Sequence, residues 1–202
     1  MRIFMRIFRG IFYGRFYIVT DLPDWAKKAR EHWKWRGESR PHFGVVPAPG
    51  EISVWDFPRP PVVVPDHREV VISRHGVEVA RTQRALCVLE TSHPPTFYLP
   101  PDDIAQHLLV AGSATSFCEW KGPARYWTLA MGGEKLINVA WSYLEPLAGA
   151  EALAGYLAFY PHELTCTVGG APVTPQPSGF YGGWITPELV GPFKGERGSE
   201  GW

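Results

Sequence analysis

The sequence predicts a single, mainly β domain of the α+β class, a sandwich, barrel or folded-over sheet, with a helical arm at its N-terminus. Gly (21) and Pro (20) exceed the roughly 14 and 10 expected at average usage for 202 residues. Aromatic residues make up 14% of the chain, and short β-branched and aromatic runs alternate with turn residues. The length suits one core, since domains hold roughly 150 residues.

Residues 1–20 repeat Met-Arg-Ile-Phe and carry four arginines but no acid. The arginines interrupt every apolar stretch, so neither a secretory signal with its roughly 7–15 apolar residues nor a spanning helix of about 20 is predicted. We expect a basic, aromatic, disordered extension. An amphipathic anchor on a membrane surface is the alternative.

Residues 21–61 are expected to form a helix followed by a proline-rich arm. Asp21 or Asp24 can cap a helix whose first turn holds Pro23. Apolar residues then recur at helical spacing, at Leu22, Trp25, Ala26, Ala29 and Trp33. We expect this helix to dock on the core and to end at Gly37, before an extended arm over 37–61.

Two hairpins are predicted in the β core, which is expected to span residues 62–174. The first joins 70–74 to 77–81 through His75-Gly76, and the second joins 164–168 to 171–173 through Gly169-Gly170, because glycine tolerates the positive φ of tight turns. The alternation of the second hairpin points Leu164, Cys166 and Val168 inward.

The rest of the core reads as short strands with few helical interruptions. Strands are predicted at 84–90, 96–99, 124–130, 138–143 and 156–160. Helices are expected at 102–108 and 147–154. Residues 175–202 are rich in Pro and Gly and are expected to wrap the surface.

Charge and cysteine content exclude several functions. Twenty basic residues balance twenty acidic ones, so the field that attracts proteins to nucleic acid is absent. The three cysteines form no CxxC pair, which argues against a disulfide scaffold and a structural zinc site. We therefore predict a cytoplasmic protein with no metal, no cofactor, no nucleic-acid partner and no membrane span.

Several longer motifs resemble the bacterial family called domain of unknown function 427. They are VWDFPRPP (54–61), RALxVLETSHPPxxYLP (84–100), CxWKGxAxYW (118–127), AWSYxEP (140–146), AFYP (158–161) and GGWITPELVGPFKG (182–195). The resemblance covers about residues 50–202 and implies a β domain of the β-tent kind. The family is also labelled nucleotidyltransferase-like, but Asp102-Asp103 is the only acidic pair available here for the Mg²⁺ that such chemistry needs.

Aromatic residues carry the functional hypothesis. We expect Trp120, Tyr126, Trp141 and Tyr143 to wall a pocket for a small molecule, since such rings hold apolar or cationic groups. His93, Cys118 and Lys121 are expected at its edge. Lys121, Arg125 and His93 would fix an anionic portion of the ligand, and Glu90 would partner His93.

Two other functions remain open from the sequence. In an enzyme, Cys118 would attack, with its thiol activated by Lys121, or His93 would act as acid or base. Alternatively, the chain is a scaffold that pairs with itself, as a homo-oligomer, or with another protein through its arms.

Overall fold

The computed structural model describes residues 22–202, so the expectations for residues 1–20 and for a cap at Asp21 lie outside it. The fold class is as predicted: the chain is mostly β, with one N-terminal α-helix and several open sheets. Within residues 22–202, no helix has both the length and the apolar character needed to span a bilayer.

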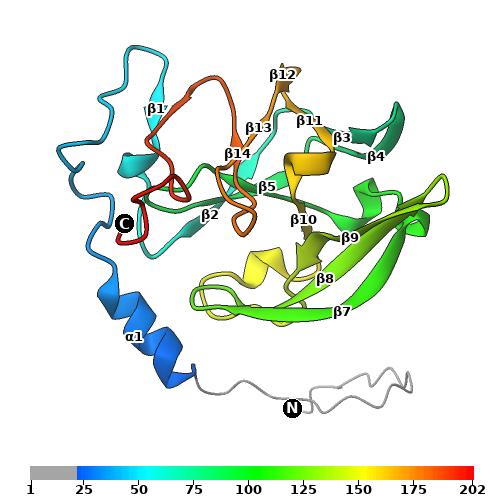
Figure 1. The fold of residues 1–202 in the computed structure, drawn as a ribbon, viewed down its shortest axis with the longest axis horizontal. Coiled ribbons are helices and arrows are strands. Elements are labelled where there is room, and N and C mark those ends of the chain that lie inside the picture. The colour runs from blue at the N-terminus through cyan, green and yellow to red at the C-terminus, as the bar shows by residue number, and fades with distance from the viewer. Residues whose placement is uncertain (1–21) are drawn as a thin grey trace, which may run out of the picture.

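The larger sheet has seven antiparallel strands. In spatial order they are β2 (Val62–Asp66), β5 (Ala85–Leu89), β6 (Thr96–Leu99), β10 (Leu157–Phe159), β9 (Glu134–Ser142), β8 (Gly122–Met131) and β7 (Leu109–Cys118). The long strands β7, β8 and β9 curve together along one side of the molecule (Figure 1). Five of the seven strands match predicted segments. The edge strands β2 and β7 were not predicted as such, since β2 contains a proline and β7 is built largely from small and polar residues.

The smaller sheet contains both predicted hairpins, in the order β12 (Ala171–Pro172), β11 (Thr165–Val168), β3 (Val70–Arg74), β4 (Val77–Thr82). His75 and Gly76 have φ of 50° and 78°, and Gly169 and Gly170 have φ of 58° and 79°, which confirms both tight turns. Two-stranded pairs, β1 (Ile52–Ser53) with β15 (Leu189–Val190) and β13 (Thr174–Pro175) with β14 (Trp184–Ile185), tie the chain ends to this body.

Period-two alternation gives the seven-stranded sheet two different faces. Phe97 and Leu99 point into the main core with Ile72 and Cys166 of the smaller sheet, whereas Tyr98 between them belongs to a second cluster. In the same way, Cys87 and Phe159 belong to the main core, whereas their neighbours Val88 and Ala158 belong to the second cluster. One face therefore packs against the smaller sheet and the other is free to form a site.

The N-terminal helix α1 (Asp24–His32) is shorter than predicted. It ends five residues before Gly37, because Trp33 already has an extended backbone with φ −67° and ψ 118°. No side chain caps its start, and Pro23 occupies the N-cap position. Only Ala26 is fully buried. Trp25 is 53% exposed, although its ring contacts Phe117 edge-on.

The two helices predicted inside the core are only short 3₁₀ turns. Residues 102–108 break at Ile104, whose backbone is extended and bridges Ala80 of β4. Residues 147–154 retain only the turn η4 (Glu151–Leu153), since Gly149 takes a φ of 90°. Tertiary hydrogen bonding and positive φ thus override local helix propensity.

The predicted arm and C-terminal wrap lie side by side at one end of the molecule (Figure 1). Trp55 of the arm donates from Nε1 to the carbonyl of Pro192, and Trp202 stacks on Phe43. Trp184 is fully buried in the main core. The two ends therefore form part of the same folded body as the central sheets.

Candidate functional site

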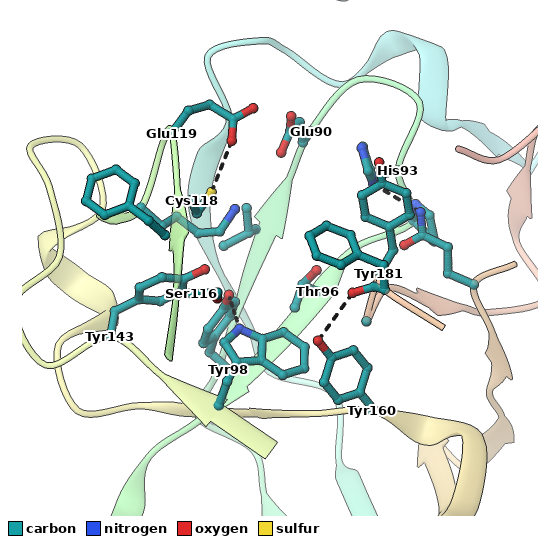
Figure 2. Close-up of a pocket in the computed structure, with 18 of the residues that line it drawn as sticks. Glu90, His93, Thr96, Tyr98, Ser116, Cys118, Glu119, Tyr143, Tyr160 and Tyr181 are labelled. Carbon is teal, nitrogen blue, oxygen red and sulfur yellow. Dashed lines mark hydrogen bonds between the residues drawn. The ribbon is translucent and has the colours of Figure 1, made fainter. Parts of the chain in front are cut away.

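A cavity of about 280 Å³ opens on the face of the seven-stranded sheet that turns away from the smaller sheet. Figure 2 shows Cys118 and Glu119 on one wall, His93 and Tyr181 on the opposite wall, and Tyr98 with Tyr160 at the bottom. This volume is near the lower end for small-molecule sites.

A row of residues across four neighbouring strands makes the cavity floor. Tyr98 of β6 pairs with Ala158 of β10, which pairs with Trp141 of β9, which pairs with Tyr126 of β8. Ala158 is the small member of this row. Over it, Trp141 donates from Nε1 to the Tyr98 hydroxyl at 3.2 Å. Tyr98, Trp141 and Tyr126 of this row line the cavity, whereas Ala158 is fully buried.

Five tyrosines line the cavity: Tyr98, Tyr126, Tyr143, Tyr160 and Tyr181. Burial raises the pKa of Tyr98 to about 12, and it also raises the pKa of Tyr143 and of Tyr160 above the usual range. The Tyr160 hydroxyl donates to the carbonyl of Phe180 at 3.2 Å, and the Tyr126 and Ser116 hydroxyls are 2.9 Å apart. Tyr98, Tyr143 and Tyr160 therefore stay neutral and act as hydrogen-bonding walls.

Lys121 reaches the cavity from the tip of the β7–β8 hairpin. Cys118 pairs with Gly122, which leaves Glu119, Trp120 and Lys121 as the loop, and Gly122 closes it with a φ of 94°. Burial acts to lower the pKa of Lys121, whereas the carboxylate of Glu90 acts to raise it, and the net shift is upward. The side chain is therefore an ammonium ion at neutral pH.

Glu119 joins the hairpin tip to the N-terminal arm. Its Oε1 accepts from Nε1 of Trp33 at 3.2 Å, and its Oε2 accepts from the Cys118 thiol at 3.7 Å. Trp33 lines the cavity, and the charged groups of Arg59 and Lys194 lie 4.6 and 5.0 Å from its ring centre. The arm thus contributes part of the cavity wall.

His93 lies on a loop held by buried polar contacts. Arg59 is buried, donates to Glu90 at 3.2 Å and also donates to the carbonyl of Thr91 at 2.8 Å. Ser92 is buried with a φ of 70°, an uncommon conformation for a residue with a Cβ. The surroundings therefore fix the loop in one conformation.

The His93 ring is held neutral. Gln176 donates from Nε2 to Nδ1 of His93 at 3.0 Å and to the carbonyl of Lys194 at 2.7 Å, while its Oε1 accepts from Gly183 at 3.0 Å. Nδ1 is therefore an acceptor, and the ring proton is on Nε2. Burial, with the positive charges of Arg59 and Lys121, lowers the pKa of His93 well below its usual value.

The segment after Gln176 closes the cavity. The Tyr181 ring meets the His93 ring edge-on with centres 4.8 Å apart. Gly182 lies against Trp141 so closely that a Cβ there would overlap the indole. Tyr160 packs against the same indole, with ring centres 4.5 Å apart.

The structure brings most of the predicted site residues to this one cavity. They are Glu90, His93, Cys118, Lys121, Tyr126, Trp141 and Tyr143. Trp120 does not line it, because the hairpin turn points Trp120 toward a second, smaller hollow. Arg125 is exposed. It lies on the face of β8 that points away from the cavity, because successive residues of a strand point to opposite faces and its neighbour Tyr126 lines the cavity.

Sequence reasoning did not single out Trp33, Tyr98, Tyr160, Gln176 or Tyr181 as site residues. Their common feature is a position that depends on tertiary structure, because they come from the arm, from strand β6, from the end of β10 and from the C-terminal segment. One local signal was present: Gly182-Gly183 indicates a close approach of the backbone to other atoms.

Metal-binding groups do not gather in the described residues. Within 22–202, no group of three or more His, Cys, Asp or Glu side chains lies close enough to hold a metal ion. Cys87 and Cys166 are buried in the main core. Asp103 lies outside the cavity, bonded to Arg84 and Thr82.

The family comparison agrees with the resemblance in the motifs. A family model described as a domain of unknown function (DUF427) matches residues 62–170, which is more than half of the chain. No curated protein matches the chain in sequence.

Proposed function

The chain belongs to the DUF427 family, and from its cavity we propose that it binds a small molecule with a flat or apolar body and an anionic group. The observation that carries this proposal is the state of Lys121. Its side chain lines this largely aromatic cavity, and within residues 22–202 it forms no ion pair. Glu90, the nearby acid, is already paired with Arg59.

A buried charge is costly unless it is paired. A carboxylate or phosphate on a ligand would supply the missing partner for Lys121, in a charge-assisted hydrogen bond. The neutral His93 offers a further donor through its Nε2–H, because Gln176 occupies the other ring nitrogen. The cavity is therefore suited to an acid more than to an amine.

Aromatic rings suit the body of the ligand. Trp141, Tyr160 and Tyr181 offer ring surface, and the cavity of about 280 Å³ is larger than the roughly 150 Å³ cavity that admits benzene in another protein. One substituted ring fits this space. Stacking on an indole or phenol adds about 0.5–1.5 kcal/mol to the burial of apolar area.

Binding can be tested with matched aromatic acids and their amides. We expect the acids, and not the amides, to quench tryptophan fluorescence and raise the melting temperature of the wild type. In Lys121→Met, acid binding should weaken about 10- to 100-fold, as expected for a lost charged hydrogen bond. The exposed Lys135→Met is the control and should bind as the wild type does. Equal binding by both variants, or no binding by any acid, would overturn the proposal.

A catalytic role is the second candidate, because Cys118 and His93 line the same cavity. The Cys118 thiol donates to Glu119, and His93 keeps its proton on Nε2, so each has a proton to give. Alkylation by iodoacetamide tests the nucleophilic form of this role. Fast reaction at neutral pH that Cys118→Ser abolishes would support it. If Cys118 does not react up to pH 9, it has no nucleophilic role, and only the binding role remains.

A further inference from the structure

A second hollow, of about 160 Å³, lies on the other side of Lys121. Arg30 of α1 and Trp120 of the hairpin tip line it together with Lys121, and Lys121 and Val88 also line the first cavity. Pro60, Pro61 and the stretch 148–150 complete its wall. The hollow thus lies where the arm, the hairpin tip and the edge of the large sheet meet.

The charged groups of this hollow are all cationic. Arg30 and Lys121 line it, and no acidic residue does within the described part of the chain. Arg30 uses Nε to donate to the carbonyl of Glu119 at 2.8 Å, and its guanidinium lies 4.9 Å from the centre of the Trp120 ring. Between residues 22 and 202, its terminal amino groups have no acceptor.

Trp120 adds a buried donor without a partner. The residue is 8% exposed, and its Nε1 forms no hydrogen bond with any atom of residues 22–202. Buried indole N–H groups usually have an acceptor, and each exception calls for an explanation. Next to two positive charges, this indole N–H is a donor for which residues 22–202 supply no acceptor.

We propose that this hollow binds a small oxyanion of the phosphate or sulfate type, held by Arg30, Trp120 Nε1 and Lys121. The guanidinium and the ammonium supply the charge, and the indole N–H supplies a directed donor. A volume of about 160 Å³ equals the liquid share of roughly five water molecules, which is enough for one tetrahedral anion. The site shares Lys121 with the aromatic cavity, whereas Arg30 and Trp120 line only this second hollow.

Calorimetric titration with inorganic phosphate, against sodium chloride at matched ionic strength, tests the site in the full chain. We expect phosphate to bind the wild type, and Arg30→Gln and Trp120→Phe each to weaken binding at least tenfold. Lys28→Gln removes the same charge from an exposed position on α1, and Trp25→Phe alters an exposed tryptophan of that helix. Both controls should bind phosphate normally. Trp120→Phe removes only the indole N–H and part of the ring, and it keeps the hydrogen bond from Arg30 to the carbonyl of Glu119 that Arg30→Gln removes.

The same variants separate this site from the aromatic cavity. Arg30→Gln should leave the binding of aromatic acids unchanged, whereas Lys121→Met should weaken both acids and phosphate, because Lys121 lines both hollows. Methyl phosphate distinguishes the source of the anion: binding equal to that of phosphate identifies the end group of a larger ligand, and rejection identifies the free ion. Phosphate binding no stronger than chloride, or unchanged in Arg30→Gln and Trp120→Phe, would overturn the proposal.

Discussion

Two single residues decide how the cavity behaves, and the first is His93. Gln176 binds its Nδ1, and burial lowers its pKa well below the usual value. The unfolded chain takes up a proton on this ring near pH 6.5, whereas the folded chain does not. Since the unfolded state then binds more protons, His93 lowers the stability of the protein as the pH falls below about 6.5.

His93→Gln should therefore flatten the pH dependence of stability. Between about pH 6.5 and 5, the wild type should lose up to about 1.4 kcal/mol of unfolding free energy per pH unit from this one proton, and the variant should not. Urea unfolding at several pH values measures the difference. The exposed His67→Gln is the control and should keep the wild-type slope. Parallel curves for wild type and His93→Gln would contradict the neutral state of His93.

Gly182 is the second such residue, because its missing side chain makes room for Trp141. Gly182→Ala should displace the indole, cost about 1–3 kcal/mol by overpacking and change the tryptophan fluorescence. Gly179→Ala, in the same segment, adds a methyl group with no atom within 4 Å and should change neither. Urea unfolding followed by fluorescence compares the two. If both variants unfold at the same urea concentration, the packing of Gly182 on Trp141 does not matter for stability.

Whole strands and hairpins show which parts of the fold the sequence predicts. The turns at His75-Gly76 and Gly169-Gly170 were predicted because their signal is local. Strand β7 was missed because Leu109–Cys118 carries small and polar residues at an edge of the sheet. Trp120 was expected to wall the pocket with Tyr126, Trp141 and Tyr143. Strand β7 ends at Cys118 and the hairpin turns at Glu119, so Trp120 lines the smaller hollow instead.

The helix α1 depends on the hairpin tip more than on its own apolar face. Ala26 is its one fully buried residue, and Glu119 holds the following Trp33. Glu119→Ala should release this end of the arm and lower its local opening free energy by about 1.5 kcal/mol. Amide exchange of residues 24–33 should then be about tenfold faster, with no change in β5, β6 and β9.

Glu38→Ala tests whether this effect is specific, since Glu38 is an exposed acid in the same arm. It should leave amide exchange in residues 24–33 unchanged. Faster exchange spread equally over the sheets in Glu119→Ala would show that Glu119 stabilises the whole fold. Unchanged exchange would show that Trp33 does not need its acceptor.

At the scale of the whole molecule, the site extends beyond the family match. Residues 62–170 supply the floor and the hairpin tip, whereas Trp33, Gln176 and Tyr181 lie outside that range and complete the walls. The sequence of a strand predicts which of its side chains share a face. It does not predict which distant segment, such as the arm or the C-terminal segment, packs against that face. This is why the aromatic floor was largely expected and the contacts around His93 were not.

Lys194 fixes the C-terminal segment that completes the site. It is 3% exposed, and its Nζ donates to the carbonyls of Ser199, Glu200 and Trp202 at 2.7, 3.1 and 3.1 Å. Burial, with the nearby charge of Arg59, lowers the pKa of Lys194. The three carbonyls therefore compensate a buried ammonium, and Gln176 bonds the backbone carbonyl of the same residue.

Deletion of residues 199–202 should leave this ammonium without acceptors and cost about 1–3 kcal/mol for Lys194 alone, beyond the loss of Trp202 packing. In a Lys194→Met background the same deletion should cost less, because it removes the Trp202 packing and the hydrogen bond from Gly195 N to Ser199 Oγ but no contact of an ammonium. Urea unfolding gives the unfolding free energy of four proteins: the wild type, the deletion, Lys194→Met and the deletion in Lys194→Met. The difference between the two costs of the deletion is the part due to Lys194. Equal costs of the deletion in both backgrounds would show that the carbonyls do not stabilise the ammonium. In that case, the contacts of the Trp202 ring with Phe43 and Trp55 hold this end of the chain.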